Sequence, residues 1–173
     1  MSKPNKKLKA KGRKLCTYVF IDATNIIYGA SDNAWKVDFK KLIKYLKERF
    51  RAKKVLYFAG LDQENKKQLK FYEKLQEFGY ILRLVPVKTF SDGRKKADVD
   101  SRMTFEMMKS LNQYQQIVIM TGDGDFYWVL EYLLKIRKKV KLIAHQQSTA
   151  KELKQLFKGD FIPIKNIRHQ IEF

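Results

Sequence analysis

The sequence has a single cysteine, Cys16, and no apolar run long enough to cross a membrane. One cysteine excludes an internal disulfide and a cysteine-based zinc cluster, and it is typical of proteins from a reducing compartment. Because a membrane helix needs about 20 apolar residues, we expect no membrane association. The N-terminus also lacks the apolar segment and small-residue cleavage site of a secretory signal. These absences together predict a cytoplasmic protein.

Two phosphate-binding motifs are also missing. No G-x-G-x-x-G follows the first apolar run, and no Walker A lysine motif occurs anywhere in the chain. Their absence argues against a nucleotide-binding or phosphatase-type α/β domain. Histidine is scarce as well, with only His145 and His169 present. His145 ends a predicted strand and is expected to be partly exposed at the start of a loop, and a metal held by carboxylates would not require a histidine.

Acidic residues are few compared with basic ones, 18 against 37, which gives a formal net charge of +19. Seven basic residues and no acid lie in residues 1–14, and we expect a flexible basic arm there. The length of the remainder, 15–173, predicts a single domain. Such an excess of positive charge favours a nucleic-acid partner, because contacts with phosphates release condensed counterions. The alternative is a general enrichment in lysine without a specific partner.

Short apolar runs alternate with amphipathic segments from Cys16 onward. The apolar runs predict strands at 16–22, 54–60, 80–88, 116–121, 140–145 and 161–164. Apolar residues at helical spacing predict helices at 38–50, 62–79, 98–112, 125–139 and 149–158. This alternation predicts a Rossmann-like, three-layer α/β/α fold with a mainly parallel sheet.

Several residues predict where individual elements begin and end. Asp38 and Asp62 are expected to cap the N-termini of two helices. Gly79 stands at the position where a helix commonly ends in a left-handed residue. Pro86 cannot donate a hydrogen bond, so its strand is expected at an edge of the sheet or to end there.

Aspartates gather at the ends of the predicted strands and at the start of one helix. Five of them are expected at the same edge of the sheet, namely Asp22, Asp98, Asp100, Asp123 and Asp125. Ligands of open α/β sheets bind outside the carboxyl ends of the strands. Two carboxylates about 4 Å apart repel each other by about 4 kcal/mol at an effective dielectric constant near 20. Their convergence therefore predicts a bound Mg²⁺ or Mn²⁺, hard cations that prefer oxygen ligands.

Simpler explanations exist for most of these acids. Capping a helix or completing a turn would account for each of the four aspartates that follow Asp22. Asp22 is harder to explain in this way, because the residues "ATN" follow it without an obvious helix start. Asn25 adds a further polar side chain at the same edge.

Three stretches of the sequence resemble a known family. "FIDATN", "KKADVD" and "IVIMTGDGDF", followed by an amphipathic segment and a further apolar run, resemble the NYN branch of the PIN-like nucleases, including LabA-like proteins. The resemblance covers residues 17–164. It implies a Rossmann-like sheet and acids that bind Mg²⁺ or Mn²⁺ for phosphodiester hydrolysis, usually of RNA. By position, the implied acids are Asp22, Asp98, Asp123 and Asp125, with Asn25 and Thr121 as polar neighbours.

One position departs from the LabA-like pattern. Those proteins often have a further aspartate where this chain has Thr104, while Asp100 lies two residues after Asp98. The number of metal ions therefore stays open, with Asp100 as an additional candidate ligand. Our hypothesis is a metal-dependent ribonuclease acting on single-stranded RNA, with single-stranded DNA as a second candidate substrate. The alternative is a non-catalytic RNA-binding module of the same fold. No heptad pattern indicates a homo-oligomer.

Basic and aromatic residues near the same edge are candidates for contacts with nucleic acid. The basic candidates for phosphate contacts are Arg94, Lys95 and Lys96, with a solvated charge run as the alternative. The aromatic candidates for stacking on unpaired bases are Tyr28, Trp35 and Phe90. By contrast, Tyr127 and Trp128 continue a predicted helix and are expected to pack in the core.

Overall fold

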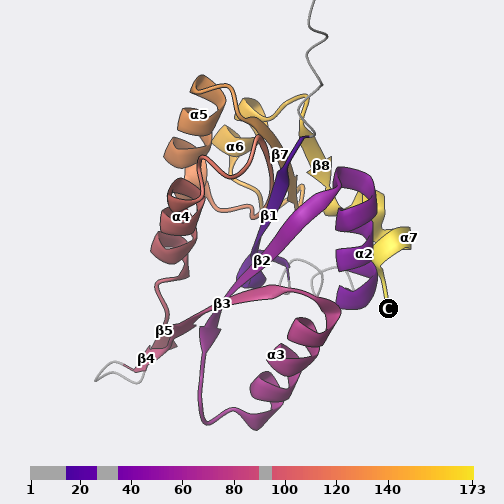
Figure 1. The fold of residues 1–173 in the computed structure, drawn as a ribbon, viewed down its shortest axis with the longest axis vertical. Helices are drawn as coiled ribbons and strands as arrows, with labels where there is room; N and C mark the ends of the chain where they lie inside the picture. Colours follow the sequence, from indigo (N-terminus) through magenta and orange to yellow (C-terminus); the bar gives the residue numbers. More distant parts are fainter. Residues whose placement is uncertain (1–14, 27–34, 90–94) are drawn as a thin grey trace, which may run out of the picture.

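The computed structural model describes residues 15–26, 35–89 and 95–173 and contains a central parallel sheet (Figure 1). Six strands form this sheet in the order β3-β2-β1-β6-β7-β8. Their bounds are β1 Thr17–Asp22, β2 Ala52–Leu61, β3 Ile81–Pro86, β6 Gln116–Met120, β7 Lys139–Ala144 and β8 Phe161–Pro163. A separate antiparallel hairpin is formed by β4 Lys88–Thr89 and β5 Lys95–Lys96. The predicted parallel α/β fold is confirmed.

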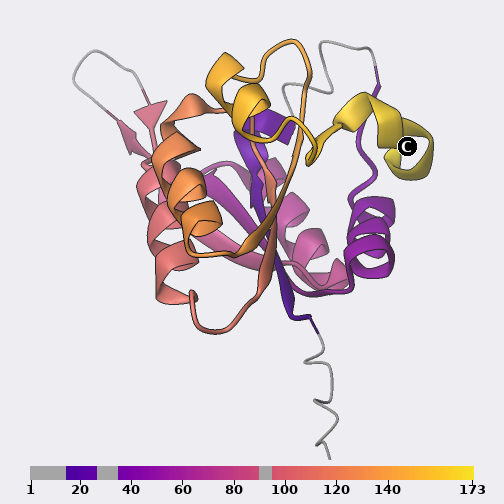
Figure 2. The ribbon, with the colours of Figure 1, turned by 90° about the horizontal axis from the view of Figure 1, so that it is seen from above.

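Helices cover both faces of the sheet and complete the three layers (Figures 1 and 2). One face carries α2 Phe39–Phe50, α3 Lys66–Phe78 and α7 Arg168–Ile171. The other carries α4 Val99–Lys109, α5 Tyr127–Lys135 and α6 Lys151–Leu156. The structure also contains two short 3₁₀ helices, η1 Gly124–Phe126 and η2 Ile164–Ile167. Within the described ranges, no helix combines the length and the apolar character that a membrane span requires.

Strand β1 illustrates how the sheet separates two cores. All six of its residues are buried, as expected for a central strand of a parallel sheet. Because side chains alternate between faces, Tyr18 and Phe20 pack in the cluster beneath α4 and α5. Val19 and Ile21 pack in the cluster beneath α2 and α3. The apolar run that predicted this strand therefore supplies both cores.

Helix boundaries agree with the sequence in some places and differ in others. Asp38 caps α2 as predicted, since its carboxylate accepts hydrogen bonds from two backbone N–H groups. Gly79 ends α3 with a positive φ of 96°, also as predicted. The prediction for Asp62 was wrong, because Asn65 caps α3 and residues 62–65 form a turn before it. Pro86 ends the edge strand β3, as expected.

The helix predicted at 125–139 is shorter and is divided in the structure. It begins as η1 and continues as α5, which ends at Lys135. Two residues later Arg137 has a φ of 62°, so the chain turns into β7 at that point. The short helix α7 was not predicted, since four residues carry too little periodicity to be recognised.

The strand order places a topological switch point between β1 and β6. The chain builds β1, β2 and β3 outward in one direction and then crosses to β6 on the other side of β1. Helix α4 makes this crossing, so its N-terminus lies at the same edge as the carboxyl ends of β1 and β6. Open α/β sheets bind their ligands in the crevice at such a point.

A buried ion pair attaches α4 to strand β3. Glu106 is 6% exposed and lies 3.3 Å from the Arg83 guanidinium, with Arg102 at 3.7 Å.

We expect Glu106→Ala to lower the free energy of unfolding by about 1–3 kcal/mol, because it leaves Arg83 without this partner. Urea denaturation followed by circular dichroism measures the loss. Glu131→Ala is the control, since its 2.8 Å pair with Lys135 is at the surface and should contribute less than about 1 kcal/mol. Equal losses for both variants would contradict a special role for the buried pair.

Candidate metal centre

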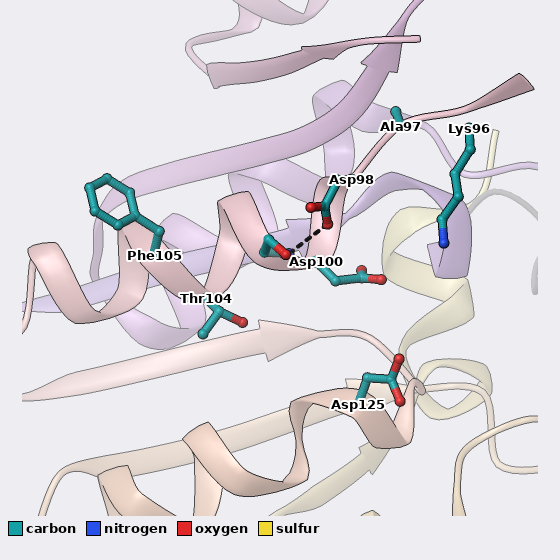
Figure 3. Close-up of a pocket in the computed structure, with 8 residues that line it drawn as sticks. Lys96, Ala97, Asp98, Asp100, Thr104, Phe105 and Asp125 are labelled. Carbon is teal, nitrogen blue, oxygen red and sulfur yellow. Dashed lines mark hydrogen bonds between the residues drawn. The ribbon is translucent and has the colours of Figure 1, made fainter. Parts of the chain in front are cut away.

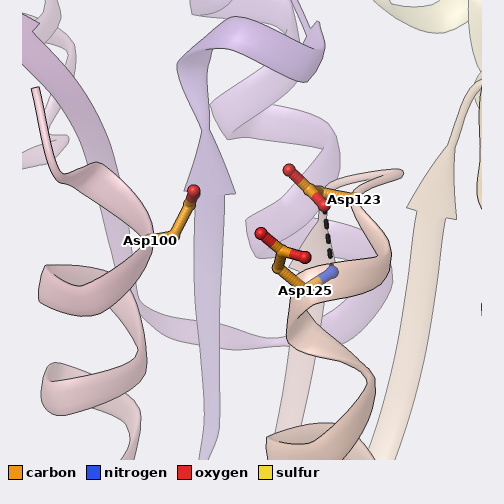
Figure 4. A group of neighbouring side chains, drawn as sticks. All are labelled: Asp100, Asp123 and Asp125. Carbon is orange, nitrogen blue, oxygen red and sulfur yellow. Dashed lines mark hydrogen bonds between the residues drawn. The ribbon is translucent and has the colours of Figure 1, made fainter. Parts of the chain in front are cut away.

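Three carboxylates from two different elements meet at the switch point. Asp100 lies in the first turn of α4, while Asp123 and Asp125 lie at the start of η1, directly after β6. One carboxylate oxygen from each of these three residues lies within 4.8 Å of the corresponding oxygens of the other two. Figure 4 shows the three side chains directed toward one another near the end of β1. This convergence was predicted from the sequence, although Asp100 was then only an additional candidate.

Asp22 is buried next to this group and held by hydrogen bonds. It is 3% exposed, and its carboxylate accepts from Asn25 Nδ2 at 2.6 Å and Thr121 Oγ1 at 3.0 Å. The backbone N–H of Thr24 also donates to it, at 3.1 Å. Burial raises the pKa of Asp22 despite these bonds, each of which acts in the opposite direction. The predicted polar neighbours Asn25 and Thr121 therefore contact Asp22 directly.

The same polar residues connect β1 with the turn after β6. Asn25 Oδ1 accepts a hydrogen bond from Gly122 N at 2.9 Å, and Thr121 Oγ1 accepts one from Asp123 N at 3.2 Å. A side chain at Gly122 would meet its neighbours, because a Cβ there would lie 3.0 Å from Thr149 Oγ1 and 3.1 Å from Asn25 Oδ1. Gly122, the first glycine of "TGDGDF", thus allows the turn to approach Asn25 closely.

Local structure corrects one expectation about the acids and gives two others a capping role. Residues 23–26 are helical, so a helix does start directly after Asp22, and the bond from Thr24 N gives Asp22 a capping role. The short polar sequence "ATN" hid this start. Asp98 caps α4 by accepting from Ser101 N at 3.3 Å, and it lies outside the group of three. Its role as a ligand stays a prediction. Asp123 caps η1 by accepting from Asp125 N at 2.9 Å, and it also belongs to the group of three.

Asp100 carries the clearest electrostatic signature of the site. Its pKa is raised to about 6, first by partial burial and then by the negative charges of the four other aspartates. The shift means that the ionised form of Asp100 is unfavourable in the metal-free protein. A divalent cation at this point would reverse that balance. The group consists of carboxylates, which suit hard cations such as Mg²⁺, Mn²⁺ or Ca²⁺. The residues present therefore fit a divalent metal.

An open groove of about 560 Å³ leads away from the acids along α4. Asp100 and Asp125 line one part of it, and Thr104 and Phe105 line the part further along the helix (Figure 3). Lys96, one of the predicted phosphate contacts, is exposed and also lines the groove.

Other predicted contacts cannot be placed in the same way. Arg94, Tyr28 and Phe90 lie outside the described residues, and for Lys95 the structure describes only the backbone, in β5.

The two tryptophans exchange their predicted environments. Trp35 was a candidate for stacking on bases, but this was wrong, because it is 6% exposed and packs in the core beneath α2. The guanidinium of Arg168, the first residue of α7, lies 5.7 Å from the centre of the Trp35 ring. Trp128 was expected in the core, which was also wrong, since it is 75% exposed. Tyr127 is partly buried and does pack against the core.

Comparison with known proteins places the chain in a family. A sequence model described as the NYN domain matches residues 17–165. The chain belongs to the NYN domain family. This family includes ribonucleases, and its members bind RNA. The match includes Asp22 and every residue of the acid group, so the site lies within the NYN domain.

Two further comparisons found a relative in sequence and a solved structure of the same fold. The chain is similar to "Low amplitude and bright protein LabA" from Synechococcus elongatus, with 27% identity over 162 residues, 89% of this chain and 86% of that protein. A crystal structure of a protein of unknown function from Vibrio parahaemolyticus has the same fold. It superimposes with a TM-score of 0.79 at 19% identity and covers 94% of this chain and 98% of that one.

Proposed function

We propose that this NYN protein is a metal-dependent ribonuclease that hydrolyses phosphodiester bonds of single-stranded RNA. The supporting observation is the group of Asp100, Asp123 and Asp125, whose oxygens lie within 4.8 Å of one another at the switch point of the sheet. The three carboxylates repel one another, a divalent cation would relieve that repulsion, and a cation placed there faces a groove open to solvent. The formal charge of +19 favours the polyanion that would bring phosphates there.

Each part of the site has a distinct proposed role. Asp100, Asp123 and Asp125 hold Mg²⁺ or Mn²⁺, which would supply Lewis acidity and lower the pKa of a coordinated water. Asp22, fixed by Asn25 and Thr121, adds negative charge and keeps the turn after β6 in place. Lys96 contacts a phosphate at the entrance of the groove. The predicted basic arm, residues 1–14, would add contacts that are independent of sequence.

The second candidate is an RNA-binding module of the same fold that does not cut. Two observations keep it open: Thr104 stands where LabA-like proteins often have an aspartate, and Asp98 is engaged in capping α4. Such a module would bind RNA equally well with and without a chelator.

A single assay separates the two candidates. Purified protein is incubated with labelled single-stranded RNA, single-stranded DNA or duplex RNA, each with Mg²⁺, Mn²⁺ or EDTA. We expect products from single-stranded RNA with Mg²⁺ or Mn²⁺ and none with EDTA. RNA binding without product under every metal condition would reject the nuclease and favour the binding module.

A further inference from the structure

One wall of the groove along α4 ends in an exposed aromatic ring. Phe105 is 54% exposed, although a phenylalanine at the surface loses the free energy that burial would provide. Its neighbours Met103 and Met107 are fully buried, so the helix directs Phe105 away from the core. The ring lines the same groove as Asp100 and Asp125 (Figure 3).

Two cations flank this ring on the same face of α4. The guanidinium carbon of Arg102 lies 5.9 Å from the ring centre, and the ammonium group of Lys109 lies 5.8 Å from it. These residues come three positions before and four positions after Phe105, a spacing that places them on one side of a helix. The result is an exposed apolar ring with two positive charges within 6 Å of its centre.

We propose that Phe105 is a stacking platform for an unpaired base, and that Arg102 and Lys109 contact the phosphates on either side of that nucleotide. Phe105 lies five positions after Asp100 in α4, which is about 7.5 Å along the helix axis. That separation suits a nucleotide close to the phosphodiester bond held at the acids. The inference rests on the proposed function and names its substrate more closely as RNA with unpaired bases.

The charges around Phe105 favour RNA over a second copy of this chain as the molecule that covers the ring. A copy would bring its own Arg102 and Lys109 toward the same two cations in a protein of net charge +19. A phosphate backbone carries the complementary charge at a regular spacing. Base pairing within a duplex covers the faces of the bases, so an aromatic platform selects single strands.

Binding measurements on the full chain test the platform. Asp123→Asn is introduced into every protein so that RNA stays intact, and fluorescence anisotropy gives the Kd for a short labelled single-stranded RNA. We expect Phe105→Ala to raise the Kd by about 5- to 150-fold, while Phe105→Trp restores binding. For an oligomer of the same length without bases, Phe105→Ala should leave the Kd unchanged. Tyr132→Ala, on α5 and 44% exposed, is the control and should bind like the parent.

Salt dependence separates stacking from charge. Phe105→Ala should keep the slope of log Kd against log salt concentration, whereas Lys109→Gln should reduce it by about 0.7, because one phosphate contact is lost. A Kd for Phe105→Ala within twofold of the parent would overturn the platform, and so would an equal loss with the oligomer that lacks bases. If Phe105→Ala instead turned a dimer into a monomer in sedimentation experiments, the ring would belong to an interface between copies, which also overturns it.

A cleavage assay without Asp123→Asn, run beside these binding measurements, distinguishes this inference from the proposed function. A protein that never cuts RNA but loses base-dependent binding in Phe105→Ala would reject the nuclease and keep the platform. A protein that cuts RNA in the parent form, with the same KM and kcat in Phe105→Ala, would keep the nuclease and reject the platform.

Discussion

Asp123→Asn should abolish metal-dependent cleavage of single-stranded RNA, lowering the rate by about 10²- to 10⁴-fold. Asp123 belongs to the group of three carboxylates, and the substitution removes one negative ligand from it. The local fold should survive, because the oxygen of asparagine can accept the hydrogen bond from Asp125 N that the carboxylate accepts now. Single-turnover cleavage with Mn²⁺ and with Mg²⁺ measures the effect.

Binding and stability measurements show whether such a loss is specific. RNA binding in EDTA should be unchanged or slightly tighter for Asp123→Asn, since one charge that repels phosphate is gone. Glu48→Gln is the matched control, because Glu48 is an exposed acid on α2, paired with Lys44 at 3.9 Å on the other face of the sheet. It should cleave at the parent rate. Full activity in Asp123→Asn would show that this carboxylate is not a ligand of the catalytic metal.

The convergence of acids could be predicted because it depends on topology. Apolar runs gave β1 and β6, and an acid follows each run in the sequence. Once these strands are parallel neighbours, Asp22 and Asp123 must lie at the same edge. The family resemblance then agreed with the domain match over almost the same residues. These parts depend on hydrophobic periodicity and strand order, which a single sequence contains.

The sequence could not show which of Asp98 and Asp100 lies in the group of three carboxylates. Both open α4, and a shift of two residues decides which carboxylate caps the helix and which points toward Asp125. Helix boundaries inferred from a sequence are uncertain by at least that much. The same limit hid the helical start after Asp22.

Trp35 shows a different limit of prediction from the sequence, because its burial depends on contacts between distant parts of the chain. It is buried where the end of the chain returns to the segment before α2, with Val37 bridging to Glu172 and Phe173 N donating to Lys36 O at 3.0 Å. Local periodicity contains no information about such a contact. For Phe105, by contrast, a signal was present: Met103 and Met107 mark the buried face of α4, and a residue two positions from each lies on the opposite side.

Replacement of Asp100 by asparagine should stabilise the metal-free protein at neutral pH and leave it unchanged in acid. The pKa of Asp100 is about 6 in the fold against 3.8 for an ordinary aspartate, so the native state binds the proton more tightly than the unfolded state. Below pH 3.8 the group is neutral in both states. As the pH rises toward 6 the unfolded state loses the proton first, so stability falls, and above 6 the full penalty remains.

The expected size of this effect follows from the same shift. A rise from 3.8 to about 6 corresponds to about 3 kcal/mol for a fully shielded group, and partial exposure reduces it to about 1–2 kcal/mol. Loss of a negative charge from the first turn of α4 offsets some of the gain. Asp100→Asn should therefore melt about 2–6 °C higher than the parent at pH 7.5 in EDTA, with no difference near pH 3.5.

With a divalent metal, the parent should melt at a higher temperature than Asp100→Asn. Mg²⁺ or Mn²⁺ binds the parent and raises its melting temperature according to ligand concentration and Kd, while Asp100→Asn, with one carboxylate fewer, should gain less. Asp98→Asn is the control, because asparagine caps helices as well as aspartate does and Asp98 lies outside the group. A lower melting temperature for metal-free Asp100→Asn at pH 7.5 would mean that Asp100 acts chiefly as a favourable charge at the helix N-terminus. The repulsion among these carboxylates would then be too weak to support the proposal of a bound metal.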